Sequence, residues 1–298
     1  MNTTTDARLV TDGGLETDLI YHHGFDLPEF AAFPLVETEH GRDALRKYYA
    51  GYAATARAAA AGLLVETPTW RANPDWGAVL GYDAAGLDRA NRSSVELLQE
   101  LAASWTDLPQ VLVSGQMGPR GDGYKPGARV DPDEAADYHR PQLASFAAAG
   151  ADQATVLTLT DVGEAIGVAR AAADVGLPLG LGFTVETDGR LPRGESLEEA
   201  IASVDADTPP AYFVINCAHP THVLEGVDEG PWRDRVHGLR VNASTMSHEE
   251  LDNSEELDDG DPVQLAADVA ALRAALPAVR IVGGCCGTDA RHVAAMWV

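Results

Sequence analysis

Short apolar runs alternate with longer amphipathic stretches along the whole 298-residue chain, and this alternation leaves few folds open. Continuously apolar runs rich in branched residues are typical of strands covered on both faces of a parallel sheet. Eight such strands are predicted: Leu9–Thr11, Leu63–Glu66, Val111–Ser114, Ala154–Thr158, Leu179–Thr184, Tyr212–Asn216, Leu239–Asn242 and Val279–Val282.

Amphipathic segments between and after these runs are predicted to be helices: Arg42–Ala61, Leu87–Ser104, Asp133–Ala149, Val162–Asp174, Leu197–Val204, a weak one near His222–Arg235, Val263–Leu276 and a short one at Ala290–Trp297. Start and stop signals support them. Asp131-Pro132 places a capping residue before a proline at the first helical position, and Gly150 follows the last periodic residue of that helix.

Eight strand-then-helix units predict an α/β protein that closes into a (β/α)8 TIM barrel, a fold that commonly takes about 250 residues. A doubly wound open sheet is the competing architecture. The GxGxxG motif of open dinucleotide-binding sheets does not follow the first strand. No Ser/Pro-rich linker divides the chain, so we expect one domain over residues 1–298. The least regular segment is Ala243–Pro262, a long acidic connection after the seventh strand.

The composition narrows the partners and the compartment. Asp and Glu number 46 against 21 Lys and Arg, a formal net charge of −25. Such a surface repels phosphate, which argues against nucleic acid and anionic membranes as partners. No apolar run approaches the roughly 18 residues of a membrane span, and no signal peptide is seen. Three cysteines, two of them adjacent, fit a reducing cytoplasm better than a disulfide framework. The acidity suits either a high-salt cytoplasm or an ordinary acidic cytosolic protein.

All three cysteines follow predicted strands. Cys217 comes after the sixth, and Cys285 and Cys286 come after the eighth within IVGGCCGT. The carboxyl ends of barrel strands share the face that carries active sites, so these sulfurs could meet at one metal ion. Three thiolates leave one position of a tetrahedral zinc site open, which is the catalytic arrangement. The alternative is that the cysteines are buried apolar fillers.

The GGCCGT motif with the following RHV, together with INC after the sixth strand, resembles the homocysteine S-methyltransferase family. The likeness continues through LVTDGGLETDL, GLLVETPTWRAN, VSGQMGPRGDGY and GLGFTVETDGRLPRGESLEEAI, and so covers nearly the whole chain. It implies a zinc-dependent (β/α)8 enzyme in which Cys217, Cys285 and Cys286 bind Zn²⁺. The homocysteine sulfur would take the fourth position.

The same resemblance implies that Asp12 binds the amino group of homocysteine, whereas an isolated Asp-Gly-Gly is also a common turn. Glu66 and Thr67, at the end of the second strand, are candidates for contacting the amino acid or for bracing the site. Asn216 is a candidate for orienting a metal ligand by a hydrogen bond to that ligand. Leu157 stands where the family usually has a Glu that contributes to substrate binding, so one polar contact is expected to be missing.

The sequence therefore predicts transfer of a methyl group from a cationic donor, S-methylmethionine or S-adenosylmethionine, to the thiol of homocysteine, forming methionine. Three alternatives stay open: a betaine- or corrinoid-linked thiol methyltransferase, a non-catalytic zinc-binding barrel with a fourth protein ligand, and a redox protein that uses a Cys285–Cys286 disulfide.

Overall fold

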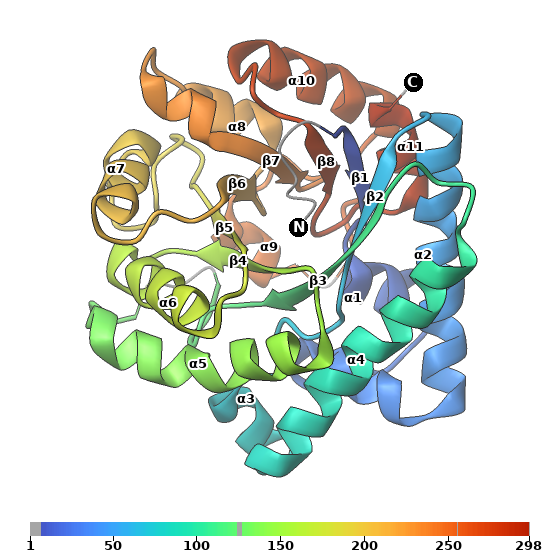
Figure 1. Ribbon diagram of the computed structural model, residues 1–298. Coiled ribbons are helices and arrows are strands. Elements are labelled where there is room, and N and C mark those ends of the chain that lie inside the picture. Colours follow the sequence, from blue (N-terminus) through green and yellow to red (C-terminus); the bar gives the residue numbers. More distant parts are fainter. Residues whose placement is uncertain (1–6, 124–126, 255, 298) are drawn as a thin grey trace.

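A computed structural model describes residues 7–123, 127–254 and 256–297. Eight parallel strands pair in sequence order and close into a barrel, with β8 returning to β1 (Figure 1). The strands are β1 (Leu9–Thr11), β2 (Gly62–Glu66), β3 (Val111–Met117), β4 (Gln153–Leu159), β5 (Leu179–Phe183), β6 (Tyr212–Asn216), β7 (Val236–Val241) and β8 (Ile281–Gly284). The predicted (β/α)8 barrel is confirmed, and the open sheet is excluded.

Helices surround the barrel (Figure 1). Those of the described chain are α1 (Leu15–Thr17), α2 (Glu39–Ala58), α3 (Pro74–Val79), α4 (Ala84–Ser104), α5 (Pro132–Ala149), α6 (Val162–Val175), α7 (Leu197–Asp207), α8 (Pro220–Glu225), α9 (His248–Asp252), α10 (Pro262–Ala275) and α11 (Ala290–Met296). A π-helix covers Asp18–His22, and 3-10 turns cover Pro28–Phe30, Phe33–Glu37 and Pro231–Arg235. None of the helices in these described ranges is long and apolar enough to cross a membrane.

Two predicted segments differ from the structure in the kind of element they form. The weak helix near His222–Arg235 is two short pieces, α8 and a 3-10 turn, because Gly226 ends the first and Pro231 begins the second. The acidic connection Ala243–Pro262 contains a helix, α9, which starts with a reciprocal capping box between Ser247 and Glu250.

The core has two layers. Seven buried residues contributed by six different strands pack together inside the barrel: Leu9, Leu64, Leu112, Leu157, Tyr212, Val214 and Ile281. A larger cluster fills the space between the strands and the surrounding helices. The interior cluster closes the middle of the barrel, so a ligand can enter only at the ends of the strands.

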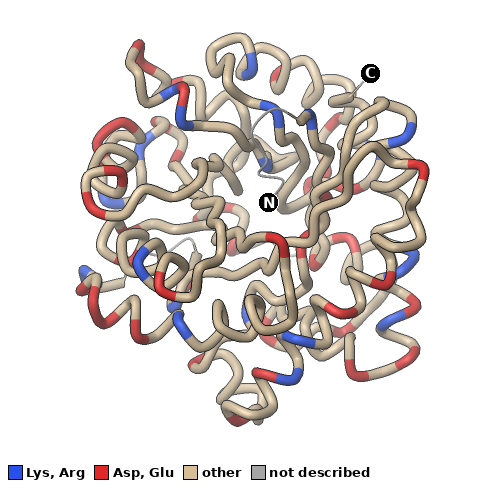
Figure 2. Tube along the Cα trace, in the orientation of Figure 1, with Lys and Arg blue, Asp and Glu red and all other residues tan. Residues whose placement is uncertain are grey.

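Acidic residues outnumber basic ones on the outer helices and loops (Figure 2).

Candidate active site

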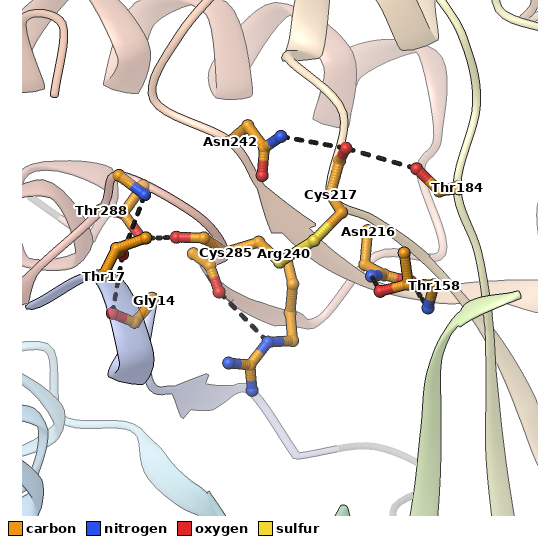
Figure 3. Close-up of a disulfide and its surroundings, with 12 residues drawn as sticks. Gly14, Thr17, Thr158, Thr184, Asn216, Cys217, Arg240, Asn242, Cys285 and Thr288 are labelled. Carbon is orange, nitrogen blue, oxygen red and sulfur yellow. Dashed lines mark hydrogen bonds between the residues drawn. A yellow bond between two sulfur atoms is a disulfide. The ribbon is translucent and has the colours of Figure 1, made fainter. Parts of the chain in front are cut away.

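The cysteines converge at the carboxyl ends of β6 and β8. The three sulfur atoms all lie within 4.8 Å of one another. A disulfide joins Cys217 to Cys285, whose Cα atoms are 5.4 Å apart (Figure 3), and Cys286 is partly exposed. The structure thus brings the three predicted ligands together. The disulfide partner of Cys285 is Cys217 rather than the adjacent Cys286.

Side chains from other parts of the chain hold the turn after β6 in its conformation. Cys217 adopts a left-handed φ of 54°, which takes the chain sharply out of the strand. Its carbonyl oxygen accepts three hydrogen bonds, from Asn242 Nδ2 (3.0 Å), Thr184 Oγ1 (3.3 Å) and His248 Nε2 (2.8 Å). Two of these bonds appear in Figure 3. Side chains from the connections after β5 and after β7 therefore hold the strained residue in place.

The turn after β8 depends on glycine. A Cβ at Gly284 would lie 1.9 Å from Thr288 Oγ1, and Gly287 has a φ of 78°. Thr288 Oγ1 in turn donates to the carbonyl of Cys285 at 2.7 Å. The flanking glycines thus allow the tight turn that aims both Cys285 and Cys286 at Cys217.

The donor set fits a zinc ion once the thiols are reduced. Zinc–sulfur bonds of about 2.3 Å place tetrahedral sulfurs about 3.8 Å apart, which the observed spacing accommodates. Among the described residues, no fourth Cys, His, Asp or Glu joins the cluster. Three thiolates at one point with a fourth position left to a ligand is the set expected of a catalytic zinc site.

A cavity of about 360 Å³ opens at this end of the barrel and is lined by all three cysteines. Asp12, just after β1, also lines it, as does Leu157 of β4. The predicted loss of a polar contact at residue 157 therefore leaves an apolar side chain on the cavity wall. Glu16 lines the cavity too, and burial raises its pKa to about 7, with the nearby charge of Asp12 adding to the effect.

Arg240 of β7 organises the buried charges beside the cysteines. Its Nη1 donates to Asp12 Oδ1 at 2.5 Å and also to Glu66 Oε2. Its Nε donates to the carbonyl of Gly284 at 3.1 Å, and its Nη2 donates to the carbonyl of Gly13 at 3.0 Å. One guanidinium thus ties β7 to β1, β2 and β8 at the cavity.

The pKa values in this cluster follow from burial and pairing. Burial raises the pKa of Asp12, against the opposing charge of Arg240, and raises the pKa of Glu66 to about 7. Burial would lower the pKa of Arg240, but the two carboxylates outweigh it and the pKa is raised. The guanidinium therefore stays charged, and the two carboxylates share it.

Two other predicted residues are engaged inside the structure. Thr67 Oγ1 accepts from the backbone amide of Gln116 at 2.8 Å and pairs with Thr69 Oγ1 at 2.6 Å. The side chain of Asn216 does not form a hydrogen bond with the adjacent Cys217. It receives a hydrogen bond from the amide of Thr158 and donates one to the hydroxyl of the same residue, both at 2.9 Å (Figure 3). Thr67 thus links the end of β2 to β3, Asn216 links β6 to β4 across β5, and neither side chain lines the cavity.

Sequence reasoning missed Arg240. The signal was present, because an arginine inside a predicted apolar parallel strand is buried and such a charge requires a partner. The holders of the Cys217 carbonyl, Asn242 and His248, were also missed. They carry no sequence pattern that distinguishes them from ordinary loop residues.

The fold and the site define a class: a (β/α)8 barrel enzyme with a three-cysteine centre at the carboxyl ends of its strands. The family model for homocysteine S-methyltransferase matches residues 9–297, and the chain belongs to that family. It is therefore an S-methyltransferase by family.

Solved structures agree on the fold. Crystal structures of the homocysteine methyltransferase MmuM from Escherichia coli match over almost the full length of both chains. The metallated form has a TM-score of 0.77 at 21% identity, covering 98% of this chain and 96% of that chain. The oxidised form has a TM-score of 0.76 at 22% identity, covering 97% and 94%.

Proposed function

We propose that the protein transfers a methyl group from a cationic donor to the thiol of homocysteine, with methionine as the product. The family assignment supports the acceptor and the reaction type. The observation that carries the proposal is the meeting of three cysteine sulfurs in a cavity, without a fourth side-chain ligand among the described residues. A non-catalytic zinc site would need that fourth ligand.

Cys217, Cys285 and Cys286 would hold the zinc ion. Zinc bound there would lower the pKa of a coordinated thiol, so that the acceptor sulfur is an anion at neutral pH. No protein base is then required to remove the thiol proton. The contribution of the chain is to hold the acceptor in line with the donor inside a cavity that admits both.

The carboxylates around Arg240 supply a place for the ammonium group of homocysteine. Asp12 and Glu66 carry two negative charges when ionised, against one positive charge on Arg240. Asp12 lines the cavity with the cysteines, and Oε1 of Glu66 is buried and has no hydrogen-bond partner among the described residues. The unbalanced negative charge favours a cationic group beside Asp12.

The cavity lining favours a cationic donor. Besides the two arginines at positions 71 and 240, it contains six acidic residues: Asp12, Glu16, Asp122, Asp252, Glu256 and Asp258. A sulfonium such as S-methylmethionine or S-adenosylmethionine enters this field favourably, and its positive charge disappears when the methyl group leaves.

The test is a methyl-transfer assay on reduced protein with measured zinc content, homocysteine and each donor in turn: S-methylmethionine, S-adenosylmethionine and betaine. We expect methionine to form with a sulfonium donor. Cys286→Ser should lose zinc and activity together, because two thiolates hold the ion much less tightly. Val263→Ser, at a residue of α10 that is 76% exposed, is the matched control. A folded Cys286→Ser protein that keeps both zinc and activity would remove the proposed centre.

A further inference from the structure

Arg71 lines the same cavity as the cysteines, in the connection after β2. Its guanidinium carbon lies 3.7 Å from the ring centroid of Trp76 and 4.7 Å from that of Trp70. Two indole rings therefore hold the group by cation–π contacts, which fix its plane without using its N–H donors.

Two donor nitrogens of Arg71 have no acceptor among the described residues. Its Nε and Nη1 are buried and make no hydrogen bond in the part of the chain that the structure describes. Burial lowers the pKa of Arg71, while the charges of Glu16, Asp122 and Asp252 act in the other direction from a distance. None of these described carboxylates forms an ion pair with it. Buried donors without acceptors are costly even on a half-buried guanidinium, so the arrangement favours an anion from outside the chain.

Arg240 shows the contrast within the same cavity. Its three nitrogens donate to Asp12, Glu66 and the carbonyls of Gly13 and Gly284. It is saturated and structural. Arg71 instead leaves Nε and Nη1 without acceptors among the described residues, and its guanidinium contacts the rings of Trp70 and Trp76. The planar fork of an arginine matches a carboxylate, which accepts two parallel hydrogen bonds.

We propose that Arg71 binds the carboxylate of an α-amino-acid substrate in this cavity. The proposal rests on the proposed function, because it takes homocysteine or an amino-acid sulfonium as the ligand. The cavity offers such a zwitterion both signs of charge: the carboxylate of Asp12 for the ammonium group and Arg71 for the carboxylate. A ligand with several negative charges is disfavoured by the six acidic residues of the lining. Arg71 is thus a specificity-determining residue that selects amino acids over simple thiols and sulfonium ions.

The test compares ligands with and without the carboxylate, by calorimetry on reduced, zinc-loaded protein. The acceptor pair is homocysteine and 3-aminopropane-1-thiol. The donor pair is S-methylmethionine and (3-aminopropyl)dimethylsulfonium. We expect the carboxylate to strengthen binding about 10-fold to 100-fold in at least one pair, as for a hydrogen bond between charged groups. The pair that shows the effect identifies whose carboxylate Arg71 binds.

Arg71→Met keeps the volume between the indoles and should reduce this ratio to about one, whereas Arg71→Lys should keep part of it. The control is Arg235→Met, which removes an arginine 5.3 Å from the ring of Phe213 at the opposite end of the barrel. Its ratio should equal that of the unchanged protein. If the unchanged protein does not distinguish either pair, or if Arg71→Met distinguishes them equally well, the proposal is overturned.

The methyl-transfer assay separates this result from the proposed function. Methionine formation with an unchanged binding ratio in Arg71→Met would reject the role of Arg71 alone. A ratio that depends on Arg71, without methionine formation from any donor, would reject the proposed reaction and leave the carboxylate site standing.

Discussion

Arg240 is the residue on which the buried charges of the cavity depend. It is 4% exposed and is the shared partner of Asp12 and Glu66. Removing it would leave two carboxylates in a desolvated place without a counter-charge, and they would have to take up protons or expose themselves to water. Its contribution is therefore one of stability as well as of site geometry.

We expect Arg240→Met to lower the free energy of unfolding by about 3–5 kcal/mol, as for a buried ion pair that loses one partner. Urea unfolding measures this change. The comparison is Arg140→Met, which breaks exposed pairs with Asp137 and Asp174 and should cost about 0–1 kcal/mol. Equal losses in the two variants would show that the Arg240 cluster adds no more than surface pairs.

The raised pKa of Glu16 predicts that the stability of the folded chain depends on pH. Its pKa is raised from 4.5 to about 7 by burial, so the folded chain keeps a proton that the unfolded chain releases in that range. The contribution of Glu16 to stability therefore falls as pH rises from about 4.5 to about 7, and stays low above pH 7. Glu16→Gln, which is neutral at every pH, should be more stable than the unchanged protein at pH 8.

Denaturant unfolding at pH 5 and pH 8 measures the effect. The stability gained by Glu16→Gln should be several-fold larger at pH 8 than at pH 5. The same substitution at the exposed Glu96 of α4 serves as the control and should give no such difference. A gain that is the same at both pH values would mean that ionisation of Glu16 is not its source.

At the scale of elements, the end of β8 determines where two of the three sulfurs lie. Gly284→Ala would drive a methyl group into the Thr288 hydroxyl, which holds the Cys285 carbonyl. We expect the turn to shift and the affinity for zinc to fall about 10-fold or more, as when the support of a metal ligand is lost. Zinc competition against a chelator measures this change.

Gly121→Ala is the matched control, because a Cβ there would have no heavy atom of the described residues within 4 Å. Circular dichroism establishes that both variants fold. If a folded Gly284→Ala protein binds zinc as tightly as the Gly121→Ala protein, the close approach at Thr288 does not position the cysteines.

The elements were predictable because each strand is an apolar run bounded by turn residues. The residues at which the strands begin and end were less predictable. The last strand was expected at Val279–Val282 but lies at Ile281–Gly284, since Arg240 and Val241 of β7 pair with Gly283 and Gly284. Pairing between strands that are distant in sequence decides such boundaries, and local composition does not report it.

The site was predictable where a residue type is rare. Three cysteines after two strands could hardly be overlooked, and their convergence follows from barrel geometry. The partners of Asn216 and of the Cys217 carbonyl could not be foreseen, because Thr158 of β4 and His248 of α9 are far away from them in sequence. The role of Asp12 as an amine contact stays a prediction, since the structure shows its pairing with Arg240.

At the scale of the molecule, the net charge of −25 destabilises the folded state, because its acidic residues repel one another. The Debye length falls from about 10 Å at 0.1 M salt to about 3 Å at 1 M, so added salt screens repulsion among the outer helices. We expect the free energy of unfolding to rise as potassium chloride increases from 0.1 to about 1 M. Urea unfolding at each concentration measures it.

The control is the same series at pH 5, where more carboxylates are protonated and the benefit of salt should be smaller. A stability that falls with salt at pH 7 would show that attractive ion pairs, and not the excess of negative charge, dominate the surface.

The closure of β8 onto β1 also has a consequence for biosynthesis. Cys217 leaves the ribosome well before Cys285 and Cys286, and Asp12 long before either. The three sulfurs meet only when the final strand enters between β7 and β1. Binding of the proposed zinc ion would therefore be a late event that follows closure of the barrel, because a partly synthesised chain lacks the complete three-cysteine set.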